Sequence, residues 1–230
     1  MKLSQIMVAA PLLALAAPLQ AQVTTYSTTS SFSSAAGAVT TETFSSCTNG
    51  AILSTGQTVS SSSGACGSIT PGITFAPTAS GHFYIAGPGQ STNPTTALGV
   101  DIFNSDPISI TFASDISAFG ADLFQNFAGG SQSSGDVAYL ITVFGPGNTL
   151  LGTFNPLVSP NGGDFFGLTS TSPISKINVS LPGGYAVIDN VRFAAFGAVP
   201  EPASWALMLL GFGAIGCALR RRSGGALARA

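Results

Sequence analysis

Between residues 23 and 197 the chain consists of short apolar or alternating runs, broken by Gly, Pro, Asn and Ser about every ten residues. No stretch repeats its apolar side chains with the period of a helix. The candidate strands are 72–75, 82–86, 98–103, 108–112, 118–124, 137–144, 150–154, 165–169, 174–180 and 186–193. Ile177, Val179 and Leu181 alternate with polar residues, so we expect them to share one inward face. Many short strands joined by turns predict an all-β fold, a β-sandwich or jelly roll.

The segment 22–70 differs from the rest, because Ser, Thr, Ala and Gly dominate it and bulky side chains are few. We expect a Ser/Thr-rich N-terminal part at 22–70, beginning as a loosely held edge or linker, and a β-domain at 71–197. Only 7% of all residues are charged and 45% are hydrophobic. Low charge also fits a disordered chain, but 16 Phe supply more apolar surface than disordered segments usually carry.

The N-terminus has the three parts of a secretory signal peptide. Lys2 is followed by the apolar stretch 6–17 and by residues 18–21, which end in the small residue Ala21. We therefore expect export, with cleavage by signal peptidase after residue 21. An N-terminal membrane anchor is the alternative, but it needs about 20 apolar residues, and this run is shorter and contains Pro11.

Export determines how the cysteines are interpreted. Cys47 and Cys66 are the only two in the expected mature domain, and exported thiols meet an oxidising compartment. A disulfide closing this loop would stabilise the fold by roughly 3 kcal/mol in the chain-entropy model. A zinc site is the weaker alternative, because the two thiols lack a CxxC spacing and His82 is the one histidine.

Groups suited to catalysis are scarce. His82 begins a strand-like run, which favours a structural or exposed role. The acids of the β-domain could in principle supply a pair for glycoside hydrolysis, but their spacing selects none; they include Asp101, Asp106, Asp115, Asp122, Asp136 and Asp164. We expect no enzyme activity and no cofactor, and the net charge of −2 makes nucleic acid an improbable partner.

Calcium is the metal for which the sequence offers candidate ligands. Asp189 and Asn190 lie inside the apolar run 186–193, and exported β-sandwiches often hold calcium with carboxylate and carbonyl oxygens. The alternative, which we prefer, is a strand-end Asp that pairs with Arg192 or with a backbone amide.

The end of the chain has three consecutive parts. These are Pro200, Glu201 and Pro202, then the uncharged stretch 203–219, then Arg220, Arg221 and Arg222. A helix over 203–219 is about 25 Å long, just short of a hydrocarbon core of about 30 Å, and spans it with slight thinning. The arginines predict a cytoplasmic end, with 223–230 inside and the β-domain outside. A plain membrane anchor fits this pattern too, but Pro202 can begin the helix and leave the preceding residues accessible to a processing enzyme.

In order and spacing, 198–222 resembles the sorting domain of PEP-CTERM proteins, in the variant where Trp-Ala follows the motif, here Trp205 and Ala206. The resemblance implies a substrate of exosortase, a membrane-embedded cysteine protease-like enzyme of Gram-negative bacteria that make exopolysaccharide. Cys217 is then a residue of the transmembrane helix with no role as a nucleophile. The extension 223–230 is longer than the family pattern leads us to expect. Residues 119–122, 165–167 and 188–193 resemble, less specifically, strands of the sandwich domains that often precede such tails.

Three functions follow as hypotheses. The first is a non-enzymatic surface or matrix protein, held in the inner membrane, processed near the PEP motif and passed outward, with a structural or adhesive role linked to exopolysaccharide. The second is a secreted carbohydrate-binding module, for which Tyr84, Tyr139 and Tyr185 are the candidate aromatic platforms, since the mature domain has no Trp. The third is a secreted hydrolase, and we expect no such activity.

Overall fold

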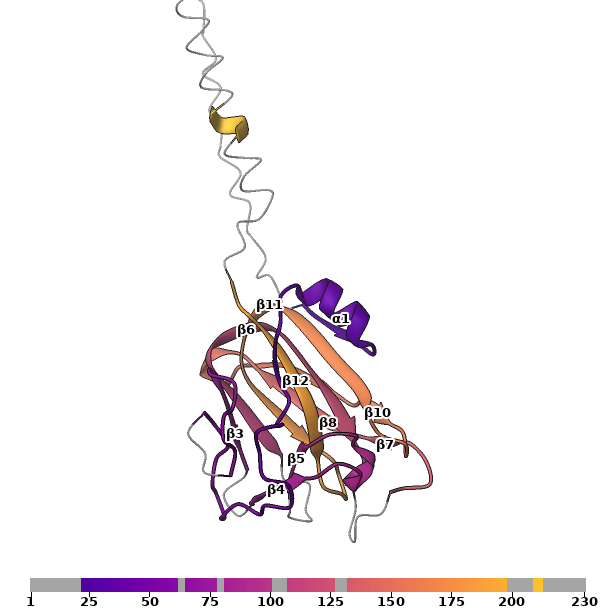
Figure 1. Cartoon of the computed structure of the whole chain (residues 1–230). Helices are drawn as coiled ribbons and strands as arrows, with labels where there is room; N and C mark the ends of the chain where they lie inside the picture. The colour runs from indigo at the N-terminus through magenta and orange to yellow at the C-terminus, as the bar shows by residue number, and fades with distance from the viewer. Residues whose placement is uncertain are drawn as a thin grey trace, which may run out of the picture.

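The computed structural model describes residues 22–61, 65–77, 81–100, 107–126, 132–197 and 209–212. Its elements are β1 (Val23–Tyr26), α1 (Thr29–Ala36), β2 (Thr40–Glu42), β3 (Ile73–Ala76), β4 (Phe83–Ala86), η1 (Gln90–Thr92), β5 (Ala97–Val100), β6 (Ile108–Phe124), β7 (Val137–Ala138), β8 (Leu140–Phe144), η3 (Pro146–Asn148), β9 (Leu150–Phe154), β10 (Leu157–Val158), β11 (Asp164–Ser180) and β12 (Val187–Ala195) (Figure 1). Ten strands form one antiparallel sheet, and β7 pairs with β10 in a second, two-stranded sheet. The all-β class is confirmed.

Two long strands, β6 and β11, form the centre of the sheet and bend together. Each has 17 residues, and a flat strand of that length would extend about 56 Å, further than a domain of this size is wide. Their pairing register shifts between Thr169 and Lys176, opposite residues 112–117 of β6. Register shifts of this kind kink a ribbon of strands. In Figure 1 β6 curves over near the end of β12.

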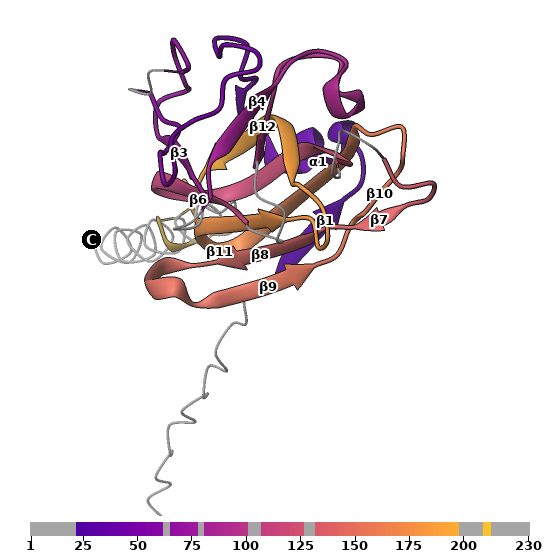
Figure 2. The same cartoon turned by 90° about the horizontal axis from the view of Figure 1, so that it is seen from below.

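The bend gives each long strand different neighbours along its length. The first half of β11 pairs with β1, and its last residues pair with β8. The first residues of β6 pair with β3, and its second half pairs with β12. Seen from below in Figure 2, β6, β11, β8 and β9 follow one another across the curved sheet. The sheet is therefore one hydrogen-bonded surface folded over, rather than the two separate sheets of an ordinary sandwich.

Helix α1 covers part of the outer face of this sheet, and no helical period in the sequence predicted it. Thr28 caps its start, accepting a hydrogen bond from Ser31 N at 3.3 Å, and Gly37 ends it with φ 74°. Phe32 is its one buried side chain. A short, Ser-rich helix that depends on a single apolar anchor has too few apolar positions to show a period.

Residues 22–70 belong to the same sheet and core as the rest of the domain. β1 and β2 pair with β11 and β12. The side chains that this segment adds to the central core are Phe44, Cys47, Leu53, Val59, Cys66 and Ile69. The first part of the segment, for which we expected a loosely held edge or linker, forms β1 and pairs with β11.

Most strands expected from the alternation are present, with shifted ends. The segments 108–112 and 118–124 are two halves of β6, and 165–169 and 174–180 are two halves of β11. The expected strand 98–103 is β5, and its last three residues lie outside the described part of the chain. Strands β1, β2 and β10 were not predicted. The expected signal peptide, 1–21, also lies outside the described residues.

Candidate functional site

The sheet leads directly to the predicted sorting tail. β12 ends at Ala195, and Phe196 N still donates a hydrogen bond to Asp115 O at 2.9 Å. The predicted motif and stop residues, Pro200, Glu201, Pro202, Trp205, Ala206, Arg220, Arg221 and Arg222, lie outside the described residues. Pro200 follows Phe196 by four residues, which span at most about 14 Å. The motif therefore starts close to the end of the folded domain.

The predicted membrane helix, 203–219, is described only at 209–212, which are helical. Within the described residues no helix has the length and apolar character needed to cross a membrane.

The predicted disulfide between Cys47 and Cys66 is present. The two residues face each other in an isolated antiparallel bridge, and backbone hydrogen bonds flank it. Thr48 N donates to Ala65 O at 2.9 Å, and Gly67 N donates to Ser46 O at 2.9 Å. The bridge thus fastens the loop of 48–65 at its base.

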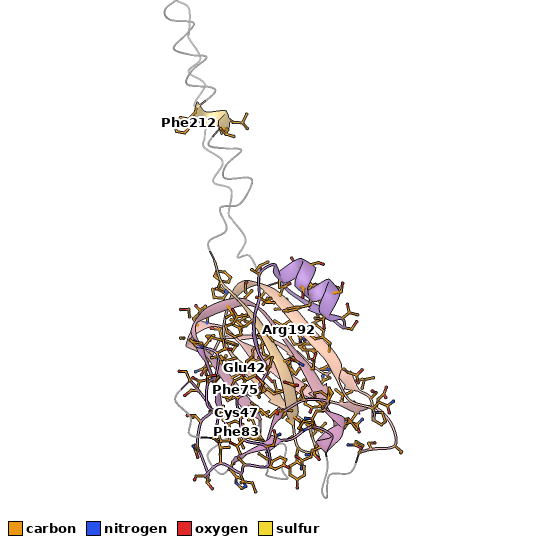
Figure 3. All side chains as sticks on the ribbon, in the orientation of Figure 1. Glu42, Cys47, Phe75, Phe83, Arg192 and Phe212 are labelled. Carbon is orange, nitrogen blue, oxygen red and sulfur yellow. A yellow bond between two sulfur atoms is a disulfide. The ribbon has the colours of Figure 1, made fainter. Side chains whose placement is uncertain are left out.

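A second fastening of the same region, which the sequence did not predict, comes from Glu42 (Figure 3). Its side chain is buried, and its two carboxylate oxygens accept hydrogen bonds from Phe44 N and Thr70 N, each at 2.6 Å. Phe44 has φ 53°, an unusual backbone conformation for a bulky residue, and its ring packs against Phe75 at 5.1 Å between centroids. Glu42 therefore holds two loops on the core. Sequence spacing alone does not pair a glutamate with residue 70.

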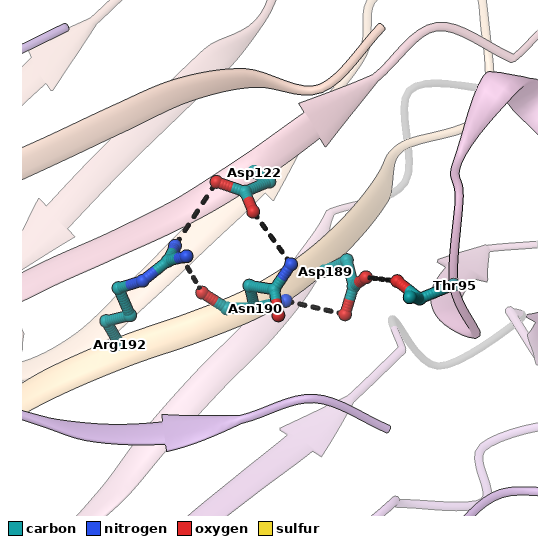
Figure 4. A network of polar contacts seen from close by, with 5 residues as sticks. All are labelled: Thr95, Asp122, Asp189, Asn190 and Arg192. Carbon is teal, nitrogen blue, oxygen red and sulfur yellow. Dashed lines mark hydrogen bonds and ion pairs between the residues drawn. The ribbon is translucent and has the colours of Figure 1, made fainter. Parts of the chain in front are cut away.

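The candidate calcium ligands Asp189 and Asn190 belong to a polar network on β12 (Figure 4). Asp189 accepts hydrogen bonds from the Thr95 hydroxyl and from Asn190 N, the second at 2.6 Å. Asn190 Nδ2 donates to Asp122 at 2.8 Å, and Arg192 forms an ion pair with the same carboxylate at 3.2 Å. Asp122 and Asp189 are opposite one another in the pairing of β6 with β12. The network spans a register shift between Asp189 and Arg192.

Burial determines the ionisation of Asp189. Its side chain has no exposed surface, and loss of solvation raises its pKa from 3.8 to about 6. The hydrogen bonds from Thr95 and Asn190 oppose this rise, since they favour the charged form. The neighbouring charge of Asp122 adds to it, and that of Arg192 reduces it.

These contacts fit the strand-end alternative for Asp189 better than a metal site. Asp189 is bonded to a backbone amide, as that alternative required, whereas Arg192 pairs with Asp122 instead. Both oxygens of Asp189 are engaged by protein donors. In the described part of the chain no three His, Cys, Asp or Glu side chains gather where they could hold an ion. Calcium binding stays a prediction, for titration calorimetry to test.

An open groove of about 540 Å³ lies between β1, the end of β9 and the start of β11. Its rings belong to Tyr26, Phe154, Phe165 and Phe166, and its polar side chains to Thr25, Ser27, Thr153 and Asn155. None of the residues that the structure places around it is charged. Tyr26 and Phe154 are partly exposed, and the Tyr26 hydroxyl lies 3.2 Å from the Thr169 hydroxyl. Tyr26 is thus the tyrosine that lines the groove, and the sequence did not select it as a platform.

The three tyrosines that the sequence selected lie elsewhere. Tyr139 is fully buried, its hydroxyl donates to Phe124 O at 2.6 Å, and burial raises its pKa well above the usual value. It is a core residue and offers no platform. Tyr84 and Tyr185 are partly exposed, and neither lines the groove.

The other candidate acids serve local structure or lie apart. Asp164 accepts a hydrogen bond from Ser159 N at 2.6 Å and so closes the turn before β11. Asp136 is exposed, and Asp101 and Asp106 lie outside the described residues. His82 precedes β4 and is partly exposed.

A family model, the PEP-CTERM protein-sorting motif, matches residues 198–223. The match confirms the resemblance found in the tail, and the chain carries the signal for exosortase-type sorting of an exported protein. No curated protein matches the sequence. Among solved structures, an arabinose-bound α-L-arabinofuranosidase aligns with 66% of this chain and 26% of its own, at 14% identity and a TM-score of 0.36. A score of that size establishes no shared fold, so the activity of that enzyme implies nothing here.

Proposed function

We propose that this chain is a substrate of exosortase that becomes a non-enzymatic protein of the cell surface or extracellular matrix. The observation that supports the proposal is the sorting motif at 198–223, placed directly after a folded β-domain. Signal peptidase removes 1–21 on export, the helix 203–219 holds the protein in the inner membrane with its C-terminus in the cytoplasm, and exosortase then processes it near Pro200–Pro202.

The role that we propose for the mature domain is structural or adhesive and linked to exopolysaccharide. Among the described residues, the two buried carboxylates are those of Glu42 and Asp189. Both accept hydrogen bonds from backbone N–H groups. A sheet with a disulfide and a charge-poor surface suits a protein that has to persist outside the cell.

The sorting step is tested by changing Pro200 and Pro202 to Ala in the producing bacterium. We expect the variant to stay in the membrane fraction, while the wild type reaches the surface or the medium. Pro182→Ala is the matched control, since it alters an exposed turn of the domain and leaves the motif intact. Release of the motif variant at the wild-type level would exclude exosortase recognition of this segment.

The groove beside Tyr26 favours carbohydrate binding as a second candidate function. Sugar sites combine aromatic rings with polar side chains, and this groove offers Tyr26 and Phe154 beside hydroxyl and amide groups without a charge. A neutral glycan suits such a lining better than an anionic one, which needs cationic partners.

A glycan array tests this candidate, followed by the Tyr26→Ala change. We expect any glycan bound by the wild type to lose at least about tenfold in affinity, because a stacking ring contributes a large part of such binding. Tyr84→Ala is the control, since Tyr84 is also partly exposed but lies outside the groove. Equal binding by wild type and Tyr26→Ala would exclude the groove as the site.

A further inference from the structure

Both ends of the folded domain are fastened to the bends of the two long strands. Gln22 N donates to the Thr171 hydroxyl at 3.0 Å, and Thr171 N donates back to Gln22 O at 3.1 Å. At the other end of the chain, Phe196 N donates to Asp115 O at 2.9 Å. Thr171 lies in the bend of β11 and Asp115 in the bend of β6, and these strands are paired on both sides of the bends. The chain thus enters and leaves the domain at one end, which we call the corner end.

Further turns complete the corner end. Ala113 N donates to Gly72 O at 2.9 Å, which places the turn before β3 there, and the turn 145–149 lies against the carbonyl of Pro173. Within these segments and the two bends, the charged residues are Asp115 and Lys176, which have opposite signs. This end therefore has no basic patch that would attract anionic lipid by itself.

We infer that the corner end faces the membrane while the tail holds the protein there, so that the opposite end of the sheet points outward. The inference rests on the proposed membrane-held intermediate. Phe196 precedes the predicted membrane helix at Ala203 by seven residues, which reach at most about 25 Å. β12 has nine residues and is about 30 Å long.

These two lengths exclude the opposite orientation. If the opposite end lay on the membrane, the corner end would stand about 30 Å above it, and the tail would have to reach further than its greatest extension. Before cleavage the signal peptide also keeps the corner end near the membrane. Gln22 is bonded to the corner end and directly follows the expected signal peptide. Exosortase consequently works beside the corner end, within about 14 Å of Phe196 at the first residue of the motif.

Energy transfer to labelled lipids tests the orientation. The chain from Gln22 onward is inserted into phosphatidylcholine vesicles with acceptor-labelled headgroups, and a donor is attached at Ser114→Cys in the corner end or at Asn161→Cys before β11. Both positions are exposed. A Cys217→Ser background leaves one reactive thiol, because Cys47 and Cys66 are bonded to each other.

We expect both samples to float with the vesicles and the donor at 114 to transfer more efficiently than the donor at 161. A Gly/Ser linker of about 20 residues inserted after Gly197 adds about 25 Å of mean reach and should remove most of that difference. Equal transfer from the two positions, or more from 161, would overturn the orientation and leave the sorting proposal standing. Failure to float would refute the membrane-held intermediate and the orientation with it.

Discussion

Glu42 and Asp189 are the buried carboxylates of the described domain, and their surroundings differ. Glu42 accepts two backbone N–H groups, one on each oxygen, which links β2 to residues 44 and 70. Asp189 accepts one backbone N–H and one hydroxyl, next to the charge of Asp122. The first arrangement joins two loops through both carboxylate oxygens, whereas the second holds a carboxyl group whose pKa burial raises.

Glu42→Gln is expected to lower the free energy of unfolding by about 1–3 kcal/mol. The amide has one acceptor oxygen, so its NH₂ group meets one of the two backbone N–H groups and leaves that donor unpaired. Urea unfolding followed by fluorescence measures the loss. Asp136→Asn, at an exposed carboxylate, is the matched control and should change stability little. Equal stability of Glu42→Gln and wild type would show that these two hydrogen bonds do not hold the loops.

Asp189→Asn is expected to change how stability depends on pH. The folded pKa of about 6 lies above the unfolded value of 3.8, so the folded state binds the proton more tightly. The stability that this carboxyl group contributes to the folded state is fully present below pH 3.8 and is lost as pH rises to about 6. The loss in the free energy of unfolding is at most about 3 kcal/mol.

Urea unfolding of both proteins between pH 3.5 and pH 7 measures this dependence, over a range set by the two pKa values. The asparagine side chain fits the same place, since its oxygen can accept from Asn190 N and its nitrogen can donate to the Thr95 hydroxyl. The variant should therefore gain on the wild type as pH rises. A constant difference between the two proteins over this range would contradict a raised pKa of Asp189.

The sequence indicated that Asp189 was unusual, because a carboxylate stood inside an apolar run. It did not indicate the partners, because Thr95 lies 94 residues away along the chain. Glu42 carried no such sign, since it stands among Thr and Ser in a segment without a clear period. Contacts made by side chains across the fold depend on the tertiary arrangement and leave no local pattern.

At the level of elements, two glycines explain how α1 attaches to the sheet. Gly120 and Gly167 are paired opposite one another on β6 and β11. The rings of Phe32 and Phe165 lie on them, with 5.4 Å between the ring centroids. A helix with one buried side chain can dock here because the sheet below it has no Cβ atoms at these positions.

Gly167→Ala is expected to destabilise the domain by about 1–3 kcal/mol. The added Cβ would lie 2.7 Å from Phe32 and 2.8 Å from Phe165, so both rings would have to move. Thermal unfolding measures the effect. Gly135→Ala is the matched control, because a Cβ there meets no atom within 4 Å. A Gly167→Ala variant as stable as Gly135→Ala would show that α1 does not need this flat surface.

Strands could be predicted from the sequence where one face is buried, as in β3 and the second half of β11. The bends could not, because apolar alternation reports which face is buried and says nothing of where a strand turns over. The two halves of β6 therefore appeared as separate strands. Helix α1 was missed because its only buried anchor is Phe32, and a single apolar residue has no period.

For the whole molecule, the sequence identifies the sorting tail, and the structure shows the end of the domain to which the tail is joined. The tail could be identified from the order of proline motif, apolar stretch and arginines, because sorting depends on short linear features. The end of the domain from which the chain continues into that tail required the fold, since it follows from the hydrogen bond of Phe196 to a bend that the alternation did not reveal.

The most direct test of the central claim is mass spectrometry of the C-terminus of the mature protein, from cells with and without exosortase. We expect a terminus near Pro200–Pro202 when the enzyme is present and an intact tail that includes Arg222 when it is deleted. The N-terminus at Gln22 serves as an internal control, because signal peptidase acts in both strains. An intact Arg222 in both strains would contradict processing at the motif.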